Sequence, residues 1–153
     1  MASQNTTLFA AQITPSTSGF VDALDSGART ITICDSFTTT SAVTAGSQTI
    51  TLCKLPIGAR VVSAELLVPA SVGTSSAKLG YGTIAADGTV TVVDDDRWGS
   101  AVDLSAVGRK QFLITAADAD YETTTEVAVV LSPVTTNFAT AIPFTFIIQY
   151  TTR

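Results

Sequence analysis

Histidine is absent from the 153 residues of this chain, and charged residues make up only 14% of them. Histidine is the usual general base near neutral pH, so its absence excludes Ser-His-Asp and Cys-His catalytic sites. Two cysteines without histidine are also too few for a Cys₄ or Cys₂His₂ zinc site. We therefore expect no enzymatic activity, no catalytic or metal-binding residue and no cofactor.

Basic residues are few and mostly isolated along the chain. Eight Lys and Arg residues stand against 13 Asp and Glu residues, for a net charge of -5, and only Arg109 and Lys110 are adjacent. Such a distribution offers no basic stripe for a phosphate backbone. Gly80-Tyr81-Gly82 lies in a strand pattern rather than before a helix, so it does not indicate dinucleotide binding. We expect no nucleic-acid partner.

Long hydrophobic runs are also missing. No apolar run approaches the roughly 20 residues needed to cross a bilayer, and residues 1–7 lack the basic and apolar regions of a secretory signal. We expect the protein to be made and folded in a cytoplasm, without a membrane partner.

Two cysteines, Cys34 and Cys53, are too few for a disulfide scaffold. Counting by twos along each strand puts both on the face that carries Thr. They would meet only if the two strands were neighbours, and folding in a cytoplasm favours free thiols.

What the chain does contain is alternation between apolar residues and Thr, over residues 30–33, 49–52, 89–92 and 144–146. Period two places one kind of residue on each face of a strand. Thr is β-branched, so these strands can bury one face and leave the other wet but uncharged. Eight strands are predicted, over residues 29–35, 47–55, 60–69, 77–84, 89–93, 109–115, 125–132 and 142–151. The sequence therefore predicts an all-β fold, a single antiparallel β-sandwich, jelly-roll-like, of about eight strands.

Three apolar rows are expected to line the space between the two sheets. They are Val62, Ala64, Leu66 and Val68 in one strand, Val127, Val129 and Leu131 in another, and Phe144, Phe146, Ile148 and Tyr150 in the last. Asp87-Gly88 is expected to close a tight hairpin between strands 77–84 and 89–93, because both residues tolerate a positive φ.

The first 28 residues show no sustained period. We expect residues 1–28 to form an extended N-terminal arm that a partner orders, followed by a β-sandwich domain over residues 29–153. A frayed terminus or an edge strand is the alternative for the first segment.

The segment 94–108 interrupts the alternation, and we expect a loop with one short helical turn that Gly108 ends. Two polar segments carry the carboxylates Asp94, Asp95 and Asp96, and Asp118, Asp120 and Glu122. Oxygen-rich loops can bind Ca²⁺, but the EF-hand spacing is missing, so a solvated turn is favoured over a metal site. Nothing in the sequence places two carboxylates across a groove, as a glycosidase requires.

Trp98 is the single tryptophan and lies between Arg97 and Gly99 in the same segment. A large aromatic side chain there can close the end of the sandwich or anchor a protein interface. Both interpretations are favoured over stacking on a sugar, because one exposed aromatic without neighbours is a poor lectin signature.

The segment 52–66, LCKLPIGARVVSAEL, resembles a pattern in small virion proteins of tailed bacteriophages, in which a strand runs into L-P-x-G-A and a second strand carries an apolar row. Pro56 and Gly58 end one strand and redirect the chain. Residues 77–83, AKLGYGT, resemble a small-residue strand of that family, and residues 142–151 resemble its aromatic and β-branched C-terminal strand.

The resemblance implies a non-enzymatic structural protein of the bacteriophage virion, a capsid decoration or cement protein that binds and stabilises the shell. Its implied partners are the major capsid protein and further copies of itself. Low charge leaves large neutral surfaces for contact, and closed symmetry is the usual way to satisfy them, so a homotrimer is expected. The alternatives are a head-fibre, neck or tail component, or a carbohydrate-binding adhesin module.

Overall fold

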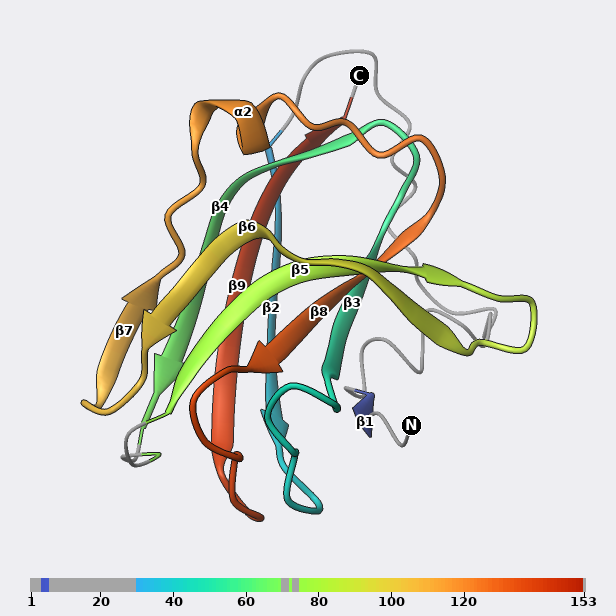
Figure 1. Cartoon of the computed structure of the whole chain (residues 1–153). Coiled ribbons are helices and arrows are strands. Elements are labelled where there is room, and N and C mark those ends of the chain that lie inside the picture. The colour runs from blue at the N-terminus through green and yellow to red at the C-terminus, as the bar shows by residue number, and fades with distance from the viewer. Residues whose placement is uncertain (1–3, 6–29, 70–71, 73–74, 153) are drawn as a thin grey trace.

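The computed structural model of the chain describes residues 4–5, 30–69, 72 and 75–152 (Figure 1). Within them the strands are β1 (Gln4–Asn5), β2 (Thr30–Thr38), β3 (Ile50–Leu55), β4 (Ala59–Val68), β5 (Ser76–Ile84), β6 (Val90–Asp103), β7 (Gly108–Gln111), β8 (Val127–Pro133) and β9 (Pro143–Thr152), and the helix is α2 (Ala116–Ala119). Each of the eight predicted strands overlaps one of β2 to β9. The predicted arm, 1–28, lies outside the described residues except for β1.

The strands form two sheets that face each other as a sandwich (Figure 1). One sheet has the order β1-β3-β8-β5-β6 and the other β2-β9-β4-β7. All pairs are antiparallel except β1 with β3, where Gln4 and Asn5 pair in parallel with Ile50 and Thr51. Four of these strands in each sheet, β3-β8-β5-β6 and β2-β9-β4-β7, follow the order of a jelly roll. The predicted fold class is confirmed.

The core lies between the sheets and is built from aromatic and branched aliphatic side chains. On β9 the predicted row Phe144, Phe146, Ile148 and Tyr150 is buried, and Phe138 packs on Phe144 with ring centroids 5.3 Å apart. Burial of each such side chain contributes about 1.5–3 kcal/mol. The predicted row on β8 is buried too, and β8, between β3 and β5 in its sheet, is buried along both of its faces.

On β4 the predicted inner row is partly wrong. Val61 is fully buried, whereas Val62 has 47% of its surface exposed. The β4 to β9 register shifts between Val61 and Ser63, which leaves Val62 as the extra residue of a β-bulge. After the bulge the side chains again alternate in step with the prediction, and Ala64, Leu66 and Val68 are buried as predicted.

A second bulge shows that the predicted face of Cys53 is wrong. The β3 to β8 register shifts between Thr51 and Cys53, so Leu52 is the extra residue and Cys53 turns into the core. Cys34 does lie on the exposed Thr face of β2, where Ser36 bonds to Thr145 with its hydroxyl at 2.9 Å. That face is wet and uncharged, as the alternation predicts.

The segment expected to be a loop with a helical turn is mostly strand. β6 continues through it to Asp103, and its pairing with β5 shifts register three times. Those shifts break the period-two pattern, which is why the sequence reads as irregular there. The helical turn is α2 instead, capped by Thr115, and Gly108 begins β7 with φ 119°.

Two glycines let the backbone of β6 lie directly against the outer side of β5. A Cβ at Gly80 would overlap the backbone oxygen of Asp94, and one at Gly82 would lie 2.6 Å from that of Thr91. The predicted hairpin at Asp87-Gly88 is present, with φ 83° at Gly88. The hairpin projects beyond the other strands (Figure 1), and Val92 is exposed there despite its place in the alternation.

Candidate functional site

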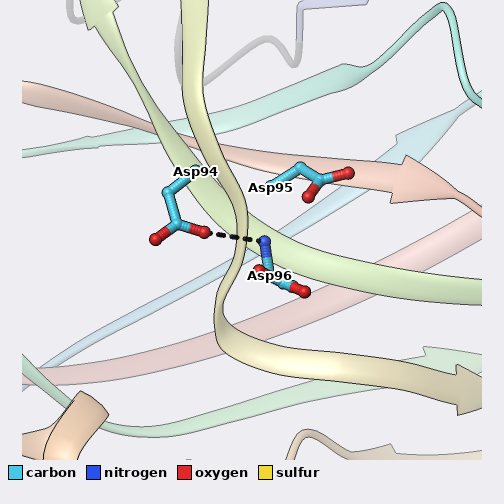
Figure 2. A group of neighbouring side chains, drawn as sticks. All are labelled: Asp94, Asp95 and Asp96. Carbon is cyan, nitrogen blue, oxygen red and sulfur yellow. Dashed lines mark hydrogen bonds between the residues drawn. The ribbon is translucent and has the colours of Figure 1, made fainter.

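Among the described residues, a group of three neighbouring carboxylates lies in β6, at the register shifts. Figure 2 shows that the side chains of Asp94, Asp95 and Asp96 leave the strand in different directions. One carboxylate oxygen from each lies within 4.8 Å of the others, and the backbone N–H of Asp96 donates to Asp94 at 3.3 Å. In a regular strand, three consecutive side chains would point alternately to the two faces of the sheet. The irregular β6 instead brings the three carboxylates close together.

Cationic side chains form ion pairs with these three carboxylates. The ammonium of Lys78 lies 3.5 Å from Asp95 and 3.6 Å from Asp96, and the guanidinium of Arg97 lies 3.0 Å from Asp94. Each carboxylate thus has a protein partner, which is the chemistry of a surface ion-pair network. The solvated turn expected here is instead a solvated, ion-paired strand.

The second group of acidic residues is divided among separate tasks. Asp118 accepts hydrogen bonds from Thr115 at the start of α2 and also lies 3.8 Å from Arg97. Glu122 accepts two hydrogen bonds from Arg60, at 3.1 and 2.8 Å. Asp118 is thereby joined to the β6 group through Arg97, whereas Glu122 belongs to the β4 surface.

Trp98 is fully buried and belongs to an aromatic cluster that the sequence did not reveal. Its ring centroid is 5.8 Å from that of Tyr81 and 6.3 Å from that of Tyr121, and the guanidinium of Arg97 lies 4.9 Å from the Tyr121 ring. Desolvation, together with a hydrogen bond to Tyr81, raises the pKa of Tyr121 to about 12. Trp98 therefore belongs to the core, and its ring has no exposed surface on which a sugar could stack.

The two cysteines are far from forming a pair. Cys34 is exposed on β2 and Cys53 is buried on β3, in the other sheet, and both are free thiols. Burial raises the pKa of the Cys53 thiol far above its usual range, and the negative charge of Asp35 adds to the shift. A thiol held neutral in this way is a poor nucleophile.

Thr123 holds the turn of the L-P-x-G-A segment in place. Its hydroxyl donates to the Pro56 carbonyl at 2.6 Å and accepts from the Ala59 N–H at 2.9 Å. Its carbonyl accepts from Gly58 N–H at 2.8 Å, and Gly58 has φ 80°. The sequence indicated the turn but not its partner, because Thr123 lies in a polar segment much later in the chain.

None of the helices in the described part of the chain has the length and apolar character needed to span a membrane.

Comparison with solved structures finds near full-length likeness to capsid chains of bacteriophages. A chain from the capsid of Ralstonia phage GP4 matches with a TM-score of 0.76 and 19% identity, over 99% of each chain. A chain from the capsid asymmetric unit of Cyanophage Pam1 matches with a TM-score of 0.55 and 18% identity, over 92% of this chain and 98% of that one. This chain has the fold of phage capsid chains.

The likeness covers almost the entire length of both chains, so this chain and the GP4 capsid chain are nearly equal in length. No protein-family model matches the chain, and no curated protein matches it in sequence. The relation to phage virion proteins expected from residues 52–66 and 77–83 is therefore supported at the level of the fold. The fold alone does not assign a role in the shell.

Proposed function

We propose that this chain is a non-enzymatic structural protein of a bacteriophage capsid, and that it acts as a decoration or cement protein. The observation that carries the proposal is the match over 99% of both chains to a capsid chain of Ralstonia phage GP4. The Pam1 match supports the same assignment. The place of the protein is then the virion, and its partner is the major capsid protein.

The surface of the sandwich supports a role in contact with other proteins. Exposed apolar side chains include Leu113, with 76% of its surface exposed, as well as Ile57 and Val107. The outer face of β2 and β9 carries hydroxyls such as Ser36 and Thr145 rather than charges. Contacts between such neutral surfaces cost little desolvation, in contrast with the burial of unpaired charges.

A symmetric trimer is the proposed form. Closed symmetry uses one surface of each subunit repeatedly, and shells offer three-fold positions at which a trimer can sit. Three linked weak contacts bind far more tightly than one. In this arrangement residues 1–28 form an arm that is attached at β1 to the edge of its own sheet and reaches a neighbouring subunit or the shell with the rest of its length, and residues 29–153 form the sandwich domain.

Deletion of the coding sequence from its phage tests the proposal. Heads without the protein should assemble but should release their DNA at a lower temperature or after milder osmotic shock. Adding purified protein to these heads should restore their stability. Heads that lack the protein and are incubated in buffer alone are the control. The number of copies per particle, measured against the major capsid protein on a gel, should be high.

Three results would contradict the cement role. If particles without the protein are as stable as the wild type but fail to adsorb to cells, the protein is an adhesin. A few copies per particle would indicate a neck, tail or head-fibre component. Absence of the protein from purified particles would overturn the virion assignment altogether.

A further inference from the structure

The four-stranded sheet has two edges at which no other described strand pairs (Figure 1). At one edge the nine-residue β2 pairs only with β9, and at the other the four-residue β7 pairs only with β4. An edge strand presents unpaired backbone N–H and C=O groups, which can pair with a strand of another chain. Both edges are therefore candidate surfaces for contact between chains.

β2 has few of the features that keep an edge strand from pairing. It contains no lysine and no proline, and its register with β9 has no bulge. Its outer face carries exposed, uncharged side chains, those of Thr30, Thr32, Cys34, Ser36 and Thr38. On the inner face, Ile31 and Ile33 pack against the core but are only partly buried. A further strand beside β2 would cover these two side chains.

The edge at β7 is also open to a partner. Leu113 and Ile114 follow this strand, and the backbone of neither forms a hydrogen bond with the described part of the chain. Leu113 has 76% of its surface exposed, and together with Val62 it lines a depression of about 230 Å³. Free backbone groups and exposed apolar side chains are what a pairing strand would contact here.

The two edges carry opposite charges. In the part of the chain that the structure describes, Lys110 of β7 is the one basic side chain without an ion pair, and its charge acts on Asp103 only from beyond ion-pair distance. Asp35, the one charged residue of β2, has no ion pair with the described residues either. Lys110 lies opposite the buried Leu66, and Asp35 opposite the buried Phe146. Both charges are therefore on the core-facing side of the sheet, where they would meet if β7 of one copy lay beside β2 of another.

We propose that β7 of one copy pairs edge to edge with β2 of a second copy, with Lys110 opposite Asp35. The pairing is antiparallel, which is the direction that β7 already has relative to β2 within one sheet. Gln111 then lies opposite Cys34 on the outer face. The contact joins two different surfaces, as contacts that close into a three-fold ring do. It rests on the proposed homotrimer and names the surfaces that form it.

Disulfide cross-linking of the full chain tests this register. Gln111→Cys places a thiol opposite Cys34 of the next copy, and both positions are exposed. Directly opposed residues have Cβ atoms about 4.5–5.5 Å apart, close enough for a disulfide after a small adjustment. Within one chain the two positions are three strand spacings apart, about 14 Å, so a bond between them must join two chains. Thr124→Cys is the matched control, because Thr124 is exposed and lies outside the strands.

After mild oxidation, Gln111→Cys should give covalent species of two and three chains on a non-reducing gel. Thr124→Cys and the double variant Gln111→Cys/Cys34→Ser should remain single chains. Light scattering before oxidation gives the mass of each variant. A trimer in which Gln111→Cys gives no cross-link, or gives it equally without Cys34, overturns the edge contact and leaves the homotrimer standing. A monomeric wild type overturns both, whereas the cement role is measured separately on particles.

Reversal of the charges tests the same contact without a thiol. Lys110→Glu should weaken association about tenfold or more, because it places two carboxylates opposite each other, and the double variant Lys110→Glu/Asp35→Lys should restore it. Asp120→Lys is the control for the change of charge, since Asp120 is exposed and outside the sheet. Circular dichroism verifies that each variant folds. A folded double variant that associates as weakly as Lys110→Glu alone would overturn the pairing of these two residues.

Discussion

The hydroxyl of Thr123 joins the turn after β3 to the segment after α2. It is buried, and it forms one hydrogen bond as donor and one as acceptor with backbone groups of Pro56 and Ala59. Removal of the hydroxyl leaves these two backbone groups with only the longer hydrogen bond between them, from the Ala59 N–H to the Pro56 carbonyl at 3.3 Å. The effect of this residue on stability should therefore exceed that of an exposed Thr.

Thr123→Val should lower the free energy of unfolding by about 1–3 kcal/mol, because Val keeps the shape but removes two hydrogen bonds to backbone groups in a buried place. The measurement is chemical denaturation followed by circular dichroism. Thr124→Val is the matched control, since Thr124 is exposed, and it should change stability by less than about 0.5 kcal/mol. Equal effects of the two substitutions would mean that the Thr123 hydroxyl does not hold the turn.

Strands were predictable from the sequence, but the faces of their residues were predictable only between bulges. Period-two alternation located all eight strands of the sandwich and the inner row of β9. The extra residue of a bulge is not restricted to particular residue types, so the sequence did not reveal the bulges at Leu52 and Val62. As a result Cys53, Val61 and Val62 were assigned to the wrong faces of their strands. The same cause hid the second half of β6.

The matched pair Val61→Ala and Val62→Ala tests the β4 bulge. Val61 is fully buried, so its substitution should cost about 1.5–3 kcal/mol from lost burial and the cavity that remains. Val62 is about half exposed, and its substitution should cost less than about 0.5 kcal/mol. Thermal or chemical unfolding of both variants gives the comparison. A larger loss for Val62→Ala would place the bulge elsewhere and restore the unbroken alternation.

At the scale of the whole molecule, the candidate sites were less predictable than the fold. The sequence grouped Asp94, Asp95 and Asp96 correctly, because they are consecutive. It could not reveal which strands form the edges of the four-stranded sheet, because the order β2-β9-β4-β7 differs from the order along the chain. The burial of Trp98 likewise depends on Tyr121, which packs on it from the segment after α2.

Purified protein should form a homotrimer if neutral surfaces and closed symmetry govern its assembly. Size-exclusion chromatography with light scattering should give three times the mass of one chain, and cross-linking on particles should give a band of three chains. A monomer that persists at high protein concentration and on cross-linked particles would contradict the trimer. High salt should not dissociate it, because contacts between uncharged groups are little affected by ionic screening.

The burial of β8 on both faces has a consequence during synthesis. Residues 127–133, VAVVLSP, are uncharged and rich in β-branched residues, which is the composition of aggregation-prone segments. Until β3 and β5 flank this strand, it is an open template for the same segment of another nascent chain, and jelly rolls close slowly because their pairings are remote in sequence. Glu126 and Pro133 stand at its two ends, where a charge and a missing N–H discourage such pairing. The centre of the finished sandwich is thus the part of the newly made chain most in need of protection.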